Sequence, residues 1–180
     1  SQIAASESYD IEAELDAWRD SRDAYERLLE MAEAQDAERA VEQLTDQLED
    51  VKESIREVER SQAVERIREL TRNAADAGDE AVAYRKDGEL LEAKRSLSTA
   101  IDRYGEARAV AEEHDLDEPL QRIEEGLGWA RERAANVRLD LVAETIEDAA
   151  KLVPEEPQLA VDKTNGIFKL LSDISLPVDR

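Results

Sequence analysis

The chain has 180 residues, of which 41% are hydrophobic and only 4% aromatic, and its 46 acidic and 24 basic residues give a net charge of −22. An apolar content of Ala, Leu, Val and Ile with six Gly and four Pro favours long helices over a β-sandwich, and zero Cys excludes disulfides and thiolate chemistry. So acidic a surface repels phosphate backbones and anionic lipids, and no apolar run approaches the roughly 18 residues of a membrane span. We therefore expect neither nucleic acid nor a membrane as partner.

The first two predicted helices each have one narrow apolar seam. The first begins at Tyr9, after a polar segment without periodicity, and apolar residues then recur every three or four positions. The two seams comprise Ile11, Leu15, Trp18, Tyr25 and Leu29, and then Val41, Leu44, Leu48, Val51, Ile55 and Val58. They are the natural halves of an antiparallel hairpin over residues 9–60. Because no Gly or Pro marks a turn between them, one continuous helix of about fifty residues is the alternative.

A change of seam phase marks the next predicted boundary. The apolar series that ends at Val58 resumes out of phase at Val64, so we expect a kink or a short break near Ser61. The default organisation is a single helical domain, 1–180, with a possible soft boundary near 61 that separates a helical hairpin, 9–60, from a second part, 62–175.

Stop and start signals divide the second part. A third helix should run to about Lys86 and end at Asp87-Gly88, and a fourth should run from Leu90 to about Glu113. The pair Asp117 and Pro119 predicts the start of a fifth helix, which ends before Pro154 and Pro157.

A last short helix is expected at about Gln158–Asp173, with Phe168 and Leu171 among its apolar residues. Asn165-Gly166 could split it, and Leu176-Pro177 should close the chain in an extended conformation. The prediction is an all-α fold: an elongated bundle of five or six long antiparallel helices, partly coiled coil.

One hairpin in this series resembles a tetratricopeptide unit. Tyr84, Gly88, Ala93, Leu97 and Ala100 stand at the aromatic, turn and small-residue positions of that family, over about residues 77–110. The resemblance implies a tetratricopeptide-like second part that binds a peptide or protein segment on a concave helical face.

The basic residues also follow an unusual pattern, because 18 are Arg and only 6 are Lys while the acids spread along the whole chain. This composition resembles that of proteins from salt-accumulating archaea, in which carboxylates replace surface Lys. The resemblance implies a halophilic, cytoplasmic protein in a high-salt cytosol. A secreted or surface fragment and an ordinary acidic protein are the alternatives.

No group of residues in the sequence matches a catalytic, metal-binding or phosphate-binding motif. His114 lacks the Glu that a di-iron bundle places three residues before its His, and Gly126-Leu127-Gly128 lacks the third Gly of a phosphate-binding loop. Close carboxylate pairs such as Glu112/Glu113 arise by chance in a chain with 46 acids and should be fully hydrated. We therefore expect no catalytic residues, no metal site and no cofactor.

Two features of the fifth predicted helix are candidates for an interaction. Small residues, Gly126, Ala130 and Ala134, lie four apart beside Trp129, which predicts either a ligand pocket walled by Trp129 or a tight helix crossing. The densest basic cluster could receive an acidic partner, or it could form ordinary intrahelical ion pairs. It consists of Arg131, Arg133 and Arg138.

The sequence thus predicts a non-enzymatic protein–protein interaction or scaffold module. Arg22 stands in the first seam, where a closed core would bury its charge, and a homodimer could supply a carboxylate or a route to solvent. Self-association through the first two helices is therefore preferred over a different protein partner. The alternative is an acidic decoy that mimics nucleic acid and binds a DNA-binding protein.

The charge of −22 predicts that the fold depends on salt. The Debye length is about 3 Å at 1 M salt and about 10 Å at 0.1 M, so self-repulsion returns as salt is lowered. We expect helicity, measured by circular dichroism, and the melting temperature to fall across that range. An unchanged melting temperature would contradict the resemblance to halophilic proteins.

Overall fold

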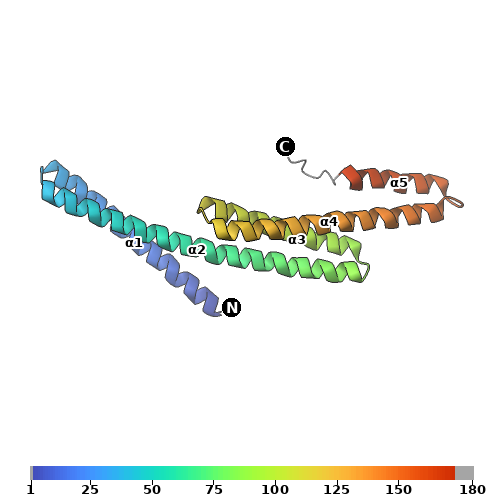
Figure 1. Cartoon of the computed structure of the whole chain (residues 1–180), viewed down its shortest axis with the longest axis horizontal. Helices are drawn as coiled ribbons and strands as arrows, with labels where there is room; N and C mark the ends of the chain where they lie inside the picture. Colours follow the sequence, from blue (N-terminus) through green and yellow to red (C-terminus); the bar gives the residue numbers. More distant parts are fainter. Residues whose placement is uncertain (1, 173–180) are drawn as a thin grey trace. The chain divides into compact units, whose positions relative to one another are not determined.

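The chain is all-α, as predicted. A computed structural model describes residues 2–172, with the surroundings of side chains for residues 11–167. In this part of the chain five helices and no strands are present (Figure 1). They are α1 (Gln2–Ala34), α2 (Glu38–Lys86), α3 (Leu90–Glu113), α4 (Asp117–Leu152) and α5 (Pro157–Ser172). The predicted extended end at Leu176-Pro177 and the side chains of Phe168 and Leu171 lie outside the described residues.

Contacts divide the chain into two units, Ser1–Arg66 and Ile67–Arg180. The division falls inside α2, close to the soft boundary that the change of seam phase suggested near residue 61. Each unit is described by itself.

In the first unit, α1 and the first part of α2 form an antiparallel hairpin, so the alternative of one continuous helix is wrong. Arg19 pairs with Glu59 at 3.1 Å, and the Tyr25 hydroxyl donates to Gln47 Oε1 at 3.3 Å. Later residues of α1 therefore face earlier residues of α2. The buried side chains of this hairpin are Leu15, Ala32, Leu48, Val51, Ile55 and Ala63.

The start of α1 differs from the prediction, because the helix begins at Gln2 rather than at Tyr9. The intervening residues include neither Gly nor Pro and contain Ala and Glu, which have high helix propensity. Loss of apolar periodicity therefore did not mark the end of the helix.

Of the kink or short break expected near Ser61, the break does not occur, because α2 is continuous over 49 residues from Glu38 to Lys86. Its buried positions run Val51, Ile55, Ala63, Ile67 and Leu70. These positions are four, eight, four and three residues apart, so the apolar face changes its direction around the helix axis. Such a stutter changes the phase of a seam without interrupting the backbone hydrogen bonds.

The same backbone motif makes the first three turns. Asp36, Gly88 and Asp115 have φ of +53°, +82° and +51°, the left-handed conformation. The next residue in each turn donates its N–H five residues back: Ala37 to Ala32, Glu89 to Tyr84 and Leu116 to Ala111, at 2.8 to 3.1 Å. This is the Schellman motif, in which Asp replaces the usual Gly in two of the turns. It confirms the predicted turn at Asp87-Gly88.

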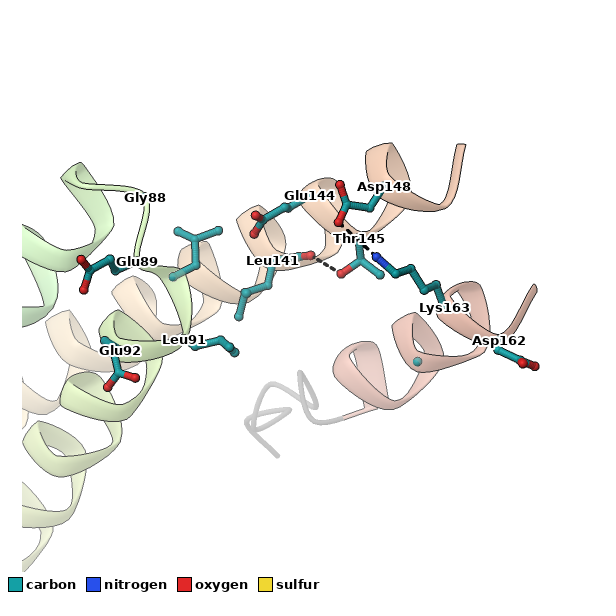
Figure 2. A pocket seen from close by; sticks show the side chains of 12 residues that line it. Gly88, Glu89, Leu91, Glu92, Leu141, Glu144, Thr145, Asp148, Asp162 and Lys163 are labelled. Atoms are coloured by element: carbon teal, nitrogen blue, oxygen red, sulfur yellow. Dashed lines mark hydrogen bonds and ion pairs between the residues drawn. The ribbon is translucent and has the colours of Figure 1, made fainter. Parts of the chain in front are cut away.

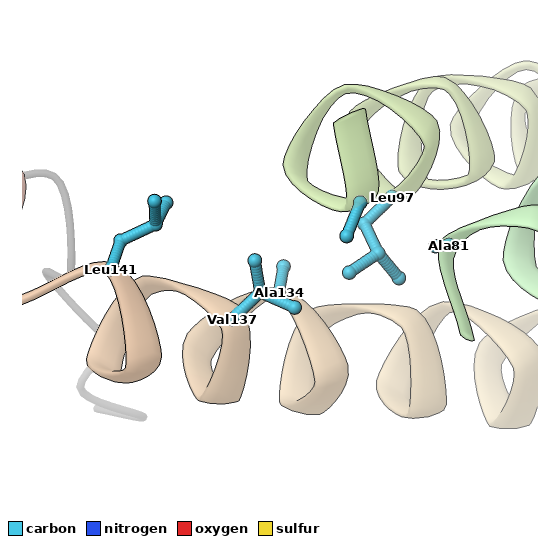
Figure 3. Packing of buried hydrophobic residues seen from close by; sticks show 6 residues of the cluster. Ala81, Leu97, Ala134, Val137 and Leu141 are labelled. Carbon is cyan, nitrogen blue, oxygen red and sulfur yellow. The ribbon is translucent and has the colours of Figure 1, made fainter. Parts of the chain in front are cut away.

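The second unit is built around α4. Small and branched side chains from the end of α2, from α3 and from α4 pack in one cluster, and Figure 3 shows Ala81, Leu97 and Val137 converging from the three helices. All three are at most 2% exposed. The predicted bounds of α3 and the predicted start of α4 at Asp117 are both confirmed.

The last helix packs against α4. Helix α5 begins at Pro157, a residue favoured in the first turn, and continues through Asn165-Gly166, so the possible split does not occur. Its Ala160 and Ile167 are buried, and Lys163 Nζ donates to Asp148 Oδ2 at 3.1 Å. These contacts hold α5 beside the C-terminal half of α4.

We expect Gly88→Ala to lower the free energy of unfolding by about 1 kcal/mol, because an L side chain at a φ of +82° is strained. Gly105→Ala is the matched control: Gly105 lies inside α3 with open space around its missing Cβ, so alanine should stabilise the helix by up to about 1 kcal/mol. Urea unfolding at constant salt measures both. Changes of the same sign in the two variants would contradict the assignment of the turn.

Candidate functional site

The four residues predicted for an interaction all lie on α4, but they do not form one cluster. Trp129 and Arg133 are four residues apart and share a face, whereas Arg131 and Arg138 are seven apart and share a different one. The Arg133 guanidinium carbon lies 5.3 Å from the centroid of the Trp129 ring. Arg138 is partly buried. Because a helix turns by about 100° per residue, neighbours in sequence point apart.

Arg131 lies in surroundings unlike those of Arg133. It lines a hollow between α3 and α4 together with Asp102, Glu106 and Glu112. Arg133 instead lines a hollow beside the end of α2, with Val82. The predicted basic cluster is therefore divided between two surfaces.

Trp129 fills the space that a glycine leaves on the neighbouring helix. A Cβ placed on Gly78 of α2 would come within 2.7 Å of Trp129 Cζ3, which is closer than real contacts allow. The same arrangement recurs between Gly126 of α4 and Tyr104 of α3, where the distance would be 2.6 Å. Burial raises the pKa of Tyr104, and the nearby Asp79 carboxylate raises it further. Both rings thus pack where helices approach closely.

The small residues that lie beside Trp129 on α4 are also part of the core. Ala130 and Ala134 are 0% and 6% exposed. Trp129 packs against the buried clusters that contain them. This placement favours a tight helix crossing over a ligand pocket walled by Trp129.

The residues that carry the tetratricopeptide resemblance lie at the turn and in the core. Gly88 makes the α2–α3 turn, and Tyr84 packs against the buried cluster. Ala93, Leu97 and Ala100 are 0%, 1% and 0% exposed. They therefore form the turn and hold the helices together.

A groove that sequence reasoning missed lies between α3, α4 and α5 (Figure 2). It has a volume of about 590 Å³, and its apolar residues include Leu90, Leu91 and Leu141. Around them stand carboxylates from the α2–α3 turn and three helices, together with Lys163. We call it the carboxylate groove, and its acidic residues are Glu89, Glu92, Glu144, Asp148 and Asp162.

One signal in the sequence pointed to this groove. Leu90 and Leu91 are adjacent in a helix, so both cannot face the same core, and Leu91 is 62% exposed. The residues of α4 and α5 that line the groove with Leu91 are 50 or more residues away in the chain and come together only through tertiary packing.

The described residues meet the requirements of neither a metal site nor a membrane-spanning helix. Within residues 2–172, no three His, Asp or Glu side chains are grouped as metal ligands would be. None of the helices in this part of the chain combines the length and the apolar character that crossing a membrane requires.

Comparison with protein-family models, with curated proteins and with solved structures finds no match to this chain. The resemblance to a tetratricopeptide hairpin therefore stays a prediction. The geometry of the carboxylate groove is the only support for a candidate site.

We expect Gly78→Ala to displace the Trp129 ring and to destabilise the second unit by roughly 1–3 kcal/mol, the usual range for overpacking. The background substitution Trp18→Phe makes Trp129 the only tryptophan in the chain, so tryptophan fluorescence reports the displacement directly. Gly128→Ala is the control, because nothing lies within 4 Å of the position of its Cβ. Equal spectra and equal unfolding midpoints for the two variants would contradict the packing of Trp129 on Gly78.

Proposed function

We propose that this chain is a non-enzymatic protein–protein interaction module and that its carboxylate groove receives a basic amphipathic segment of a partner protein. The observation that carries the proposal is the presence of an apolar floor and five carboxylates in one hollow. A segment with Leu or Ile on one face and Lys or Arg at its margins would cover the apolar floor and neutralise the rim.

The floor offers accessible apolar surface. Leu91 is 62% exposed, while Leu141, which also lines the groove, is 7% exposed and belongs to the buried cluster. An anchoring side chain of a partner contributes most binding free energy where an exposed apolar residue lies next to a rigid core. Few side chains of this protein then lose conformational freedom on binding.

The rim carries more carboxylates than cations. Within the described residues, Asp148 pairs with Lys163 at 3.1 Å and Glu92 with Arg95 at 2.6 Å. The other three carboxylates have no ion pair in this part of the chain. They come from the α2–α3 turn, from α4 and from α5, and they are Glu89, Glu144 and Asp162. Cations of a partner would therefore not have to displace existing ion pairs at these three positions.

One argument for the predicted homodimer was that a closed seam would bury Arg22, and this premise is wrong. The Arg22 side chain is 37% exposed, and its Nη2 donates to Asp23 Oδ1 at 2.8 Å, a bond that raises the pKa of Arg22. One chain satisfies this charge by itself, so we propose a different protein as the partner.

A high-salt cytosol, which the composition suggests, would shape the recognition. At about 1 M salt, attraction between charges is screened within about 3 Å, so contact of apolar side chains must supply much of the affinity. This distinguishes the proposal from a nucleic-acid mimic, which binds basic proteins through carboxylates alone and has no need of an apolar floor.

The test uses a synthetic helix of roughly five turns, with Leu along one face and Lys on the others, labelled with fluorescein. Binding to the full chain at about 1 M KCl is followed by anisotropy, at a salt concentration where helicity is intact. We expect Leu91→Ser to weaken binding about tenfold or more. Leu139→Ser, a change at a leucine of α4 that is 53% exposed and does not line the groove, should leave binding unchanged.

A second peptide, with every Leu replaced by Ser, retains the charge of the first. Equal affinities for the two peptides would overturn the apolar floor and favour the nucleic-acid mimic. Equal losses in Leu91→Ser and Leu139→Ser would overturn the groove as the binding site.

A further inference from the structure

A second hollow in the same unit carries the opposite charge. It has a volume of about 290 Å³ and lies where the end of α2 meets α3 and α4. We call it the basic hollow, and its lining consists of Ala81, Val82, Arg85, Lys86, Leu97, Arg133 and Val137. This lining contains three cations and no carboxylate, although acids outnumber bases by 46 to 24 in the chain. The local charge is therefore the reverse of what composition alone would give.

The floor of the basic hollow is firm and apolar. Ala81, Leu97 and Val137 are at most 2% exposed and converge in the cluster that Figure 3 shows. Val82 follows Ala81 on α2 and is 43% exposed. An incoming apolar side chain would thus find an accessible valine beside a packed core.

Two of the three cations are held in position by neighbours. Arg85 Nε donates to Asp140 Oδ2 at 2.7 Å, which uses one of the five N–H donors of the guanidinium. Arg133 lies over the Trp129 ring, and the close approach of that ring to Gly78 fixes its place. Guanidinium groups held in this way lose little freedom when they bind a carboxylate.

Two of the cations lack a carboxylate partner within the described residues. No ion pair in this part of the chain involves Lys86 or Arg133. The positions three and four residues from Arg133 on α4 are Trp129, Ala130, Asn136 and Val137, so the helix offers it no acidic neighbour. Arg133 and Lys86 remain free to bind an anion from another molecule.

The geometry points to a binding site for an acidic segment of a partner protein, in which an apolar side chain covers Val82 and flanking carboxylates bind Lys86 and Arg133. The volume suits one large side chain rather than a whole ligand, and the apolar floor would gain nothing from a bare anion.

This site shares no lining residue with the carboxylate groove, so its existence does not depend on the proposed function. Together the two surfaces would let one chain hold a basic and an acidic segment at once, as an adaptor does.

The test uses a fluorescein-labelled peptide with one Leu between two pairs of Glu, titrated with the full chain at about 1 M KCl. This salt screens the overall repulsion between two acidic molecules but leaves contacts within about 3 Å. We expect Arg133→Gln and Lys86→Gln each to weaken binding about tenfold, the effect of losing one charge-assisted hydrogen bond. Arg131→Gln is the matched control: it makes the same change of charge two residues away, in a different hollow that three carboxylates and Arg108 also line, and should change affinity less than twofold.

Val82→Asp gives a second route to the same answer if Arg133→Gln disturbs Trp129. It places a carboxylate at an exposed position of the rim and should abolish binding, whereas Val161→Asp, at an α5 residue that is 52% exposed and outside both hollows, should not. Absence of binding to the unaltered chain, or equal losses in Arg131→Gln and Arg133→Gln, would overturn the site. Inorganic phosphate that competes as well as the unlabelled peptide would show a simple anion site instead.

Discussion

Close approach of helices through two glycines is the constraint on which the second unit depends. Gly78 and Gly126 have no side chain where the rings of Trp129 and Tyr104 lie, so α4 contacts α2 and α3 at short range. The core is rich in alanine, and each alanine buries little apolar area, so its stability must come from proximity and many weak contacts. Both hollows lie beside this core, because Leu141 of the carboxylate groove and Ala81, Leu97 and Val137 of the basic hollow belong to one packed cluster.

Much of this fold could be predicted from the sequence, and the exceptions have physical causes. The bounds of α3, the turn at Gly88 and the start of α4 at Asp117 follow from strong local signals. The hairpin turn at Asp36 could not be decided, since aspartate adopts the left-handed conformation less often than glycine and leaves no clear mark. The short break considered near Ser61 does not occur, because a stutter within a continuous helix produces the same change of seam phase as a break.

The candidate site was harder to predict, because it depends on tertiary neighbours. Arg131 and Arg133 are close in sequence, yet the helix turns them to different hollows. Arg133 instead joins Arg85 and Lys86, which precede it by more than 40 residues. Periodicity alone reveals which residues share a face of one helix, and it says nothing about which face of another helix lies opposite.

The three Schellman turns also bear on how the chain reaches its native state. Each joins helices that are neighbours in sequence. In the second unit, the helices that pack together are neighbours in the chain, as α3 with α4 and α4 with α5, or are separated by one helix, as α2 and α4. Proteins in which helices pack on their neighbours in sequence generally fold faster than β proteins, within microseconds to milliseconds for small helical bundles. Synthesis at about 5–20 residues per second is far slower. Each hairpin can therefore close soon after its second helix leaves the ribosome, while the rest of the chain is still being made.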